Sequence, residues 1–521
     1  MKKFLISAAA VAMMFASCSK DKEIEYITVH DTVTVNKEVE KVVEKEKLIG
    51  YYTENTPLII EKGDTVIVNY GNIEVGKQNG QDIVYEMYST IMDPKKGKYT
   101  EYTLNCNALG ALALKDAEGG LKGQDMENPV THVTIVNRGT ITVHTKDLVE
   151  KYRNQIQTPD NQGLKYKYFR VIVMFAGKNS KVVNEGKINV YFDHDPEILS
   201  TVYVMGLVAG DGGEIVNSGE INFYGTGSKY TRMRGAATFA NSITIINDGK
   251  ISAKVDVAED SRGITTGGTN TNVVNNGTIE MTLPGTLFGM TRYANNNLVN
   301  NGTIKLTSVA CPEQYRLTDF KICSAFYDPH NDKRTGLLSP MLNRGTVTVD
   351  MQGAEEAQNR VGIGMMIDVL ANSTQEYINE NLNVYIENEG AIKVSSVSPS
   401  IPVAEAGFKS SAAGVGAAVT LGQWKTTLRD FAQTKDLFLS LGLKMNVNVG
   451  KLILSAPDNY TSGTAYSIAQ NAIISARNPN QVTEITGYDN MTVASGSADY
   501  ELVWDKENQT AALKKSEVAA K

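Results

Sequence analysis

Two short acidic clusters are the residues whose types and spacing come nearest to catalytic chemistry. Asp193-His194-Asp195 and Glu259-Asp260 each follow a stretch that alternates like a strand, which places them on turns. Hydrolysis of a glycosidic bond needs two carboxyl groups as acid and base, and a lyase needs calcium-binding carboxylates beside a Lys or Arg base. The chain has no adjacent Asp-Asp pair, and a solvated turn explains both clusters better. We therefore predict no catalytic residue, no metal ligand and no cofactor, with a polysaccharide lyase or hydrolase as the alternative.

Tyrosine and arginine gather in two stretches that interrupt an otherwise regular chain. These stretches cover residues 146–167 and 312–334, and both are predicted to form exposed loops. Tyr and Arg often anchor binding interfaces because they combine contact area with directional hydrogen bonds. The candidate binding residues are Tyr152, Arg153, Tyr166, Tyr168, Tyr315, Arg316, Tyr327, His330 and Arg334. The alternative is that both insertions are tolerated differences in length without a ligand.

Cys18 ends a stretch that predicts lipid attachment. Residues 1–17 have the pattern of a signal peptide, because Lys2 and Lys3 precede an apolar run too short to span a bilayer permanently. Residues 15–18, Phe-Ala-Ser-Cys, resemble a lipobox, and residues 19–23 resemble the export signal of Bacteroidota-type surface lipoproteins. This resemblance implies acyl chains on Cys18, an outer-membrane anchor and a protein that faces the cell exterior. An ordinary secretory signal followed by a charged tether is the alternative.

The other cysteines leave the redox chemistry open. Cys106, Cys311 and Cys323 do not have the spacing of a zinc site. Outside the cytoplasm a disulfide is permitted, and Cys311 and Cys323 bracket half of the second insertion. The sequence is equally compatible with buried free thiols. It also leaves open glycosylation at Thr32 and Thr65, each of which lies between an Asp and a Val.

A repeated seven-residue unit must position all of these residues. It has the form Asn-x-Gly-x-Ile-x-Val, which is a turn followed by the alternating pattern of a half-buried strand. The Gly is expected to supply a positive φ at the turn, and the Asn side chains either bond in a ladder or only shape the turn. The paired positions are Asn137 and Gly139, Asn184 and Gly186, Asn217 and Gly219, Asn247 and Gly249, Asn275 and Gly277, Asn300 and Gly302, Asn343 and Gly345, and Asn388 and Gly390. Weaker copies begin at Asn69 and Asn448.

A second motif indicates that the repeats are coils of a solenoid. Gly206, Gly235, Gly263 and Gly289 each precede an apolar residue and lie at a nearly constant distance before the next repeat Asn. Each central coil then carries at least two strands, and stacking buries the apolar face that one coil leaves open. The repeats resemble right-handed parallel β-helices of the pectin-lyase-like and autotransporter-passenger kind. This resemblance, over roughly residues 64–455, implies an all-β fold: a right-handed, single-stranded parallel β-helix with capping elements and loop insertions.

The chain divides into five predicted segments. They are a lipoprotein signal peptide (1–17), the lipidated Cys with export signal and stalk (18–49), an N-terminal cap with the first coils (50–135), a regular β-helix with insertions (136–399), and the last coils with a C-terminal cap (400–521). A third insertion, 352–385, should contain a strand at 362–366. Residues 423–435 are expected to form an amphipathic helix and residues 500–513 a closing hairpin.

Together these features predict a surface-exposed, lipid-anchored β-helix that presents loops for adhesion or for binding a glycan or protein, without catalysis. The formal net charge of −7 argues against a nucleic-acid partner. The expected partners are the outer membrane, through Cys18, and one glycan or protein ligand whose identity stays open, as does the oligomeric state. A structural component of the cell surface is a further alternative, because one fold hosts many functions.

Overall fold

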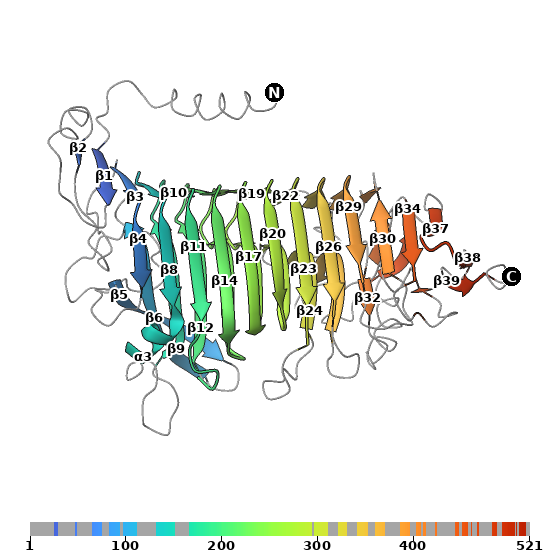
Figure 1. Cartoon of the computed structure of the whole chain (residues 1–521), viewed down its shortest axis with the longest axis horizontal. Coiled ribbons are helices and arrows are strands. Elements are labelled where there is room, and N and C mark those ends of the chain that lie inside the picture. Colours follow the sequence, from blue (N-terminus) through green and yellow to red (C-terminus); the bar gives the residue numbers. More distant parts are fainter. Residues whose placement is uncertain are drawn as a thin grey trace.

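Short alternating strands stack into three long sheets that run side by side along one axis. Figure 1 presents the computed structural model, with sheet B facing the viewer and the chain passing from blue to red along the axis. The structure describes residues 25–29, 47–48, 65–75, 83–93, 97–111, 132–151, 166–198, 200–293, 296–310, 321–330, 341–352, 360–369, 386–395, 403–407, 410–412, 422–424, 443–446, 451–456, 460, 466–467, 482–486, 492–505, 507 and 510–516.

The three sheets contain most of the described strands. In spatial order, sheet A contains β2 (Lys47–Leu48), β1 (Glu25–Val29), β3 (Thr65–Asn69), β7 (Thr134–Asn137), β10 (Lys181–Asn184), β13 (Glu214–Asn217), β16 (Thr244–Asn247), β19 (Asn272–Asn275), β22 (Asn297–Asn300), β25 (Met341–Asn343), β28 (Ile386–Asn388) and β31 (Ser410–Ala412). Sheet B contains β4 (Asn72–Val75), β8 (Thr140–His144), β11 (Lys187–Phe192), β14 (Glu220–Gly227), β17 (Lys250–Val257), β20 (Thr278–Leu283), β23 (Thr303–Ser308), β26 (Thr346–Met351), β29 (Ala391–Val394), β30 (Val403–Gly407), β34 (Lys451–Ser455) and β37 (Thr492–Ser495). Sheet C contains β5 (Ile83–Asp93), β6 (Gly97–Ala111), β9 (Tyr166–Ala176), β12 (Thr201–Ala209), β15 (Arg232–Thr238), β18 (Asp260–Thr266), β21 (Thr286–Arg292), β24 (Lys321–His330), β27 (Arg360–Val369) and β32 (Gly422–Trp424).

Each regular coil contributes one strand to each sheet, in the order A, B, C. The repeat unit forms the corner from A to B, and the second glycine motif lies in C. Equivalent residues of successive coils are paired in parallel, so that Asn184, Asn217 and Asn247 lie in one row. The all-β, parallel β-helix predicted from the repeats is therefore confirmed.

The core is a set of aliphatic rows between the sheets. Ile188, Ile221, Ile251 and Ile279 occupy one row of sheet B and are fully buried. Burying such a side chain contributes about 1.5–3 kcal/mol, and stacking repeats this gain at every coil. The glycines of sheet C make room for this row, since a Cβ on Gly263 would meet Cγ2 of Ile279 at 2.7 Å.

The expectation that the repeat glycines have a positive φ is wrong. Among the described residues, positive φ occurs at other positions. Five lie two residues before a strand of sheet A, namely His132, Asn179, Gly212, Ser242 and Asn270, and three are Gly225, Gly227 and Gly285. The repeat glycine is needed for a different reason, which is the close approach of consecutive coils.

The regular stacking changes at both ends. At the first coil, β5 and β6 form an antiparallel hairpin in sheet C, and β1, from the predicted stalk, pairs in parallel with β3. At the last coils, β30, β31 and β32 add antiparallel strands to the three sheets. The strand of the weak copy at Asn448 is β34, which the antiparallel β30 separates from β29 and which pairs in parallel with β37; Asn448 itself lies outside the described residues.

Smaller elements complete the described structure. The expected closing hairpin is confirmed as β38 (Tyr500–Asp505) and β39 (Thr510–Lys515), with β35 (Tyr466–Ser467) beside them, and β33 (Leu443–Asn446) pairs with β36 (Val482–Thr486). The strand expected in the third insertion is confirmed as part of β27. Most of the helix expected at 423–435 lies outside the described residues, and its first two residues belong to β32. No helix of the described chain is long and apolar enough to cross a membrane.

Parts of the first two insertions, which were expected to be loops, form regular elements. The first begins with α3 (Thr145–Lys151), whose Leu148 and Val149 are buried in the core. It ends in β9. The second contains β24, a full strand of sheet C.

Candidate functional site

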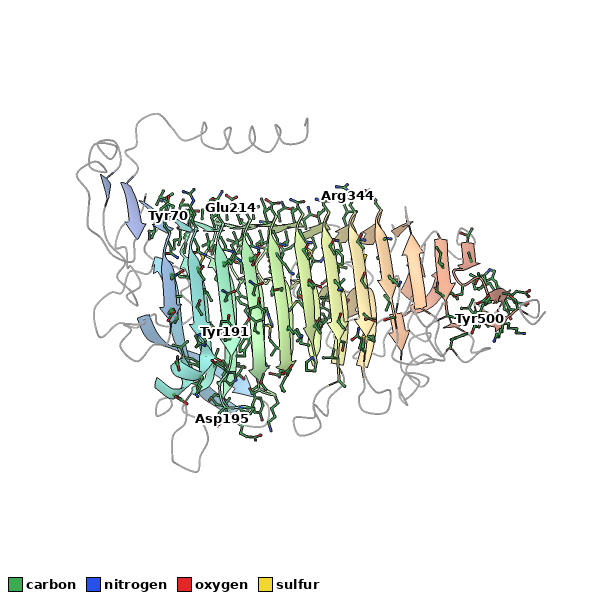
Figure 2. All side chains as sticks on the ribbon, viewed as in Figure 1. Tyr70, Tyr191, Asp195, Glu214, Arg344 and Tyr500 are labelled. Carbon is green, nitrogen blue, oxygen red and sulfur yellow. The ribbon has the colours of Figure 1, made fainter. Side chains whose placement is uncertain are left out.

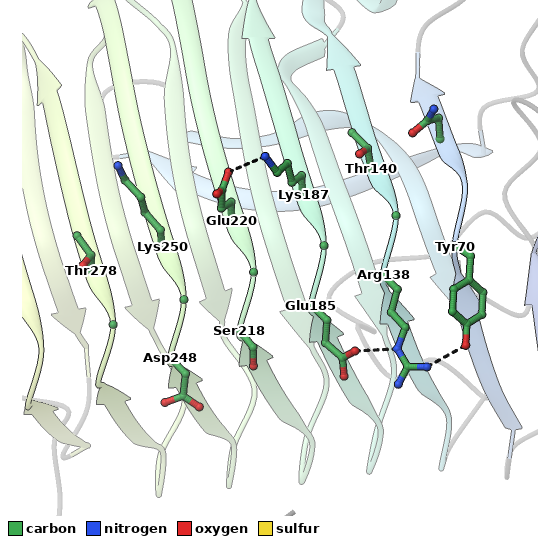
Figure 3. A pocket seen from close by; sticks show the side chains of 16 residues that line it. Tyr70, Arg138, Thr140, Glu185, Lys187, Ser218, Glu220, Asp248, Lys250 and Thr278 are labelled. Carbon is green, nitrogen blue, oxygen red and sulfur yellow. Dashed lines mark hydrogen bonds and ion pairs between the residues drawn. The ribbon is translucent and has the colours of Figure 1, made fainter. Parts of the chain in front are cut away.

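A groove runs along the corner between sheets A and B, with the repeat glycines as its floor. It has a volume of about 710 Å³ and passes over Gly139, Gly186, Gly219, Gly249 and Gly277 (Figure 3). No side chain fits on this floor, because a Cβ on each of these glycines would lie 2.0–2.1 Å from the carbonyl oxygen of the preceding repeat glycine. The floor is therefore continuous backbone across consecutive coils.

Two rows of side chains form the walls. The turn row is the residue between Asn and Gly in each repeat, and the strand row is the residue after Gly. The turn row contains Tyr70, Arg138, Glu185, Ser218 and Asp248, and the strand row contains Asn72, Thr140, Lys187, Glu220, Lys250 and Thr278. The same turn position continues to Arg344, and Tyr70 and Arg344 lie on one long edge of the solenoid (Figure 2).

Charged groups in the walls are paired along the axis. Arg138 Nε lies 2.7 Å from Glu185 Oε2, and Arg138 Nη1 donates to the Tyr70 hydroxyl at 2.8 Å. Lys187 Nζ lies 3.6 Å from Glu220 Oε2. All four ionic side chains are 42–59% exposed, so the pairs contribute little to stability and remain accessible to a ligand.

An asparagine ladder fixes the corner from inside. In each rung, the side-chain Nδ2 of one repeat Asn donates to the side-chain Oδ1 of the next repeat Asn at 2.6–2.8 Å, and the ladder runs from Asn69 to Asn388. These side chains are at most 1% exposed. Of the two roles left open for the Asn, the structure therefore has the ladder. Because every rung ties one coil to the next, the walls of the groove keep the spacing of the coils.

The first acidic cluster has structural partners. Asp193 Oδ1 accepts the backbone N–H of Lys146 at 2.7 Å, at the start of α3, and Asp193 Oδ2 lies 2.9 Å from His144 Nδ1. His194 is 2% exposed and lies between the hydroxyls of Thr145 and Thr231, at 2.8 and 3.4 Å. Burial lowers the pKa of His194 to about 4, against the opposing effect of the neighbouring carboxylates.

The second cluster is held by arginines on the outer side of sheet C. Asp260 Oδ2 lies 2.7 Å from Arg234 Nη2 and 3.0 Å from Arg262 Nη2. Burial alone would raise the pKa of Asp260, but the two guanidinium groups have the larger effect and hold this pKa well below its usual range. Glu259 receives two hydrogen bonds from Arg232, at 2.8 and 2.9 Å. Asp260 is therefore held ionised as a partner of arginine, which makes it a poor general acid.

The structure describes four of the nine sequence-predicted binding residues, and these lie in two different strands of sheet C. Tyr166 and Tyr168 belong to β9, and the guanidinium of Arg232 lies 5.8 Å from the ring centroid of Tyr168. The expectation that Tyr327 sits on an exposed loop is wrong, because it lies in β24, is 4% exposed and stacks on Phe288 with ring centroids 4.0 Å apart. His330 is the last residue of β24. Cys18, Tyr152, Arg153, Tyr315, Arg316 and Arg334 lie outside the described residues.

One of the cysteines considered for a disulfide lies in the described part of the chain. Cys323 is buried in the core, while Cys311 lies outside the described residues. Within the described ranges, no group of three or more His, Cys, Asp or Glu residues is placed to hold a metal ion.

Sequence reasoning missed the groove because it concentrated on the insertions. The signal was present in the two variable positions of the Asn-x-Gly-x unit, which hold Arg138, Glu185, Asp248, Lys187 and Lys250. Knowing that equivalent repeat positions stack would have placed these charges in two parallel rows.

Comparison with known proteins identifies the family of this chain. No curated protein and no solved structure matches it. A family model described as the BigA third pectate lyase-like domain matches residues 26–315, which is more than half of the 521-residue chain. The match begins at β1 and covers the coils that form the groove, in agreement with the stacked parallel sheets. The chain therefore belongs to the family of the BigA third pectate lyase-like domain.

Proposed function

We propose that this protein is a non-catalytic, surface-anchored β-helix that binds an extended ligand in the groove over the repeat glycines. The observation that carries the proposal is the groove itself, in which two exposed rows of polar side chains flank a backbone floor across at least five coils. A long, shallow site of this kind suits a polymer better than a compact small molecule, which is usually held in a concave and mostly apolar pocket.

The contacts of the acidic clusters support binding rather than turnover. Asp193 is engaged at the start of α3, and Asp260 and Glu259 are engaged by arginines. A glycosidase acid must hold a proton near neutral pH. The lowered pKa of Asp260 opposes that role.

The proposal includes a cellular location. The lipobox at Cys18 and the export signal after it would tether the solenoid to the outer membrane by acyl chains, facing the cell exterior. In that position a rigid solenoid would display the groove for adhesion. The insertions at residues 146–167 and 312–334 are the alternative binding site, and the experiment below separates the two possibilities.

The test compares two tryptophan variants in the same coil. Ser218→Trp fills the middle of the groove, whereas Thr226→Trp changes an exposed residue at the far end of β14. Binding to glycan arrays and to cells should fall by at least about tenfold for Ser218→Trp and stay within about twofold for Thr226→Trp. A third variant, shortened within residues 152–165, should bind like the wild type.

Two results would contradict the proposal. If only the variant shortened within residues 152–165 loses binding, the ligand site lies in the first insertion and not in the groove. If purified protein cleaves polysaccharide and loses that activity on Asp193→Asn or Asp195→Asn, the enzyme alternative is correct. Circular dichroism of all variants checks that the solenoid is intact.

A further inference from the structure

We infer that the ligand of the groove is an uncharged, polyhydroxylated polymer, namely a neutral glycan held extended along the axis of the coils. This inference rests on the proposed binding function and adds the chemical class of the ligand. Three features of the groove carry it: its charge balance, the state of its backbone and the mixture of hydrogen-bonding groups in its walls.

The lining has no net charge. Arg138, Lys187 and Lys250 contribute three positive charges, and Glu185, Glu220 and Asp248 contribute three negative ones. The strand row alternates in sign, as Lys187, Glu220 and Lys250, and the turn row carries both signs, so a ligand that follows the groove meets both. A polyanion would gain attraction at the cations and lose a similar amount at the carboxylates beside them. The whole chain carries a formal net charge of −7, which further disfavours a polyanion such as polyuronate.

The backbone N–H groups of the floor already donate hydrogen bonds to the preceding coil. The Gly186 N–H donates to the backbone carbonyl oxygen of Asn137 at 2.8 Å. The N–H groups of Lys187 and Glu220 donate to the carbonyl oxygens of Gly139 and Gly186, respectively, both at 2.9 Å. The strands of sheet B beneath the strand row, such as β11 and β14, are paired on both sides. A peptide that binds by adding a strand needs an unpaired edge. The groove has none along these coils.

The walls suit hydroxyl groups. The Thr140 and Ser218 hydroxyls both donate and accept, while Lys187 donates and Glu220 and Asp248 accept. A sugar hydroxyl is also donor and acceptor at once, so it can use both the donors and the acceptors of the two walls. Because these groups recur at the ~4.8 Å spacing of stacked strands, a polymer of repeating, similar units can make the same contacts coil after coil.

The experiment measures affinity for named polymers at two salt concentrations. Wild type is titrated with neutral oligosaccharides (β-1,4-glucan, xylan and mannan series), with polygalacturonate and with an arrayed library of extended peptides. We expect at least one neutral series to bind, with affinity that rises with chain length and changes less than about twofold between about 0.05 and 0.5 M salt. Ser218→Trp should abolish this binding, and Thr226→Trp should preserve it.

A charge-reversed variant tests the charge argument by gain of function. Replacing Glu185 and Glu220 with Lys changes the lining from zero to +4, because each reversal adds two charges. The variant should acquire binding to polygalacturonate that weakens steeply with salt, and the wild type should lack it. This readout does not depend on retaining the original ligand, and dichroism confirms the fold.

Each remaining outcome counts against one claim. Salt-sensitive binding of polygalacturonate by the wild type, lost in Ser218→Trp, would overturn the neutral class while leaving the groove as the binding site. Binding of peptides but not of neutral oligosaccharides would overturn it as well. If no ligand distinguishes Ser218→Trp from Thr226→Trp, the proposed function itself fails.

Discussion

The interior asparagine ladder should be a main source of cohesion between coils, and Asn247→Ala tests this directly. Asn247 is 1% exposed, accepts a hydrogen bond from Asn217 Nδ2 at 2.7 Å and donates one to Asn275 Oδ1 at 2.6 Å. Replacement by Ala removes both rungs in one step. It leaves a buried donor on one side and a buried acceptor on the other.

The expected loss follows from those two orphaned groups. An unmade hydrogen bond of a buried neutral group costs about 1–3 kcal/mol, so the two together cost roughly 2–6 kcal/mol. Asn217 Nδ2 retains a second contact, to the Lys250 carbonyl at 3.3 Å, which favours the lower half of that range. The matched control is Asn276→Ala, because Asn276 has equivalent bonds to Asp248 and Asn301, at 2.7 and 2.8 Å, but is exposed to water.

The assay is unfolding in urea, followed by amide hydrogen exchange, because a solenoid can open one part at a time. Asn247→Ala should lower the unfolding free energy by roughly 2–6 kcal/mol and increase exchange in the neighbouring coils. Asn276→Ala should change it by less than about 0.5 kcal/mol. Equal losses in the two variants would refute the argument that burial makes the interior ladder strong.

Three further predictions concern titration, a buried ion pair and attachment. Because burial lowers the pKa of His194 from 6.5 to about 4, the unfolded chain binds more protons than the folded chain between these pH values, and the unfolding free energy should drop by about 3 kcal/mol as pH falls from 6.5 to 4. His194→Gln should remove most of this pH dependence in thermal melts, and an unchanged pH dependence would contradict the prediction. Asp260→Asn, which leaves two arginines without their carboxylate, should cost about 3–5 kcal/mol in urea unfolding, against less than about 1 kcal/mol for the exposed control Glu280→Gln; equal costs would argue against a buried pair. Cys18→Ser should abolish acylation and release the protein from membranes in fractionation; retention with the outer membrane would show that the lipobox assignment is wrong.

The repeat made the fold predictable, since its two-residue alternation and its Asn-x-Gly corner recur with little change. The role of the glycine was mistaken, because sequence shows that Gly is required but not whether the reason is φ or crowding; here Gly139 meets the carbonyl of Gly71. Tyr327 was misplaced for a related reason: a long interval between repeats was taken as loop, although the interval contains the sheet C strand of that coil.

The candidate site was less accessible to sequence reasoning. A groove along a solenoid corner is made by residues that are distant in the chain, such as Arg138 and Glu185, and it exists only once the register of coils is known. Insertions attract attention because they break the pattern. In this molecule the candidate groove lies instead in the variable positions of the pattern itself.

A crystal structure of the protein with the neutral oligosaccharide that binds most tightly would test the central claim most directly. Ligand density should run parallel to the solenoid axis over Gly186, Gly219 and Gly249, with sugar hydroxyls contacting both rows of side chains. Density confined to the insertions at residues 146–167 or 312–334, or to the outer face of sheet C, would contradict this prediction.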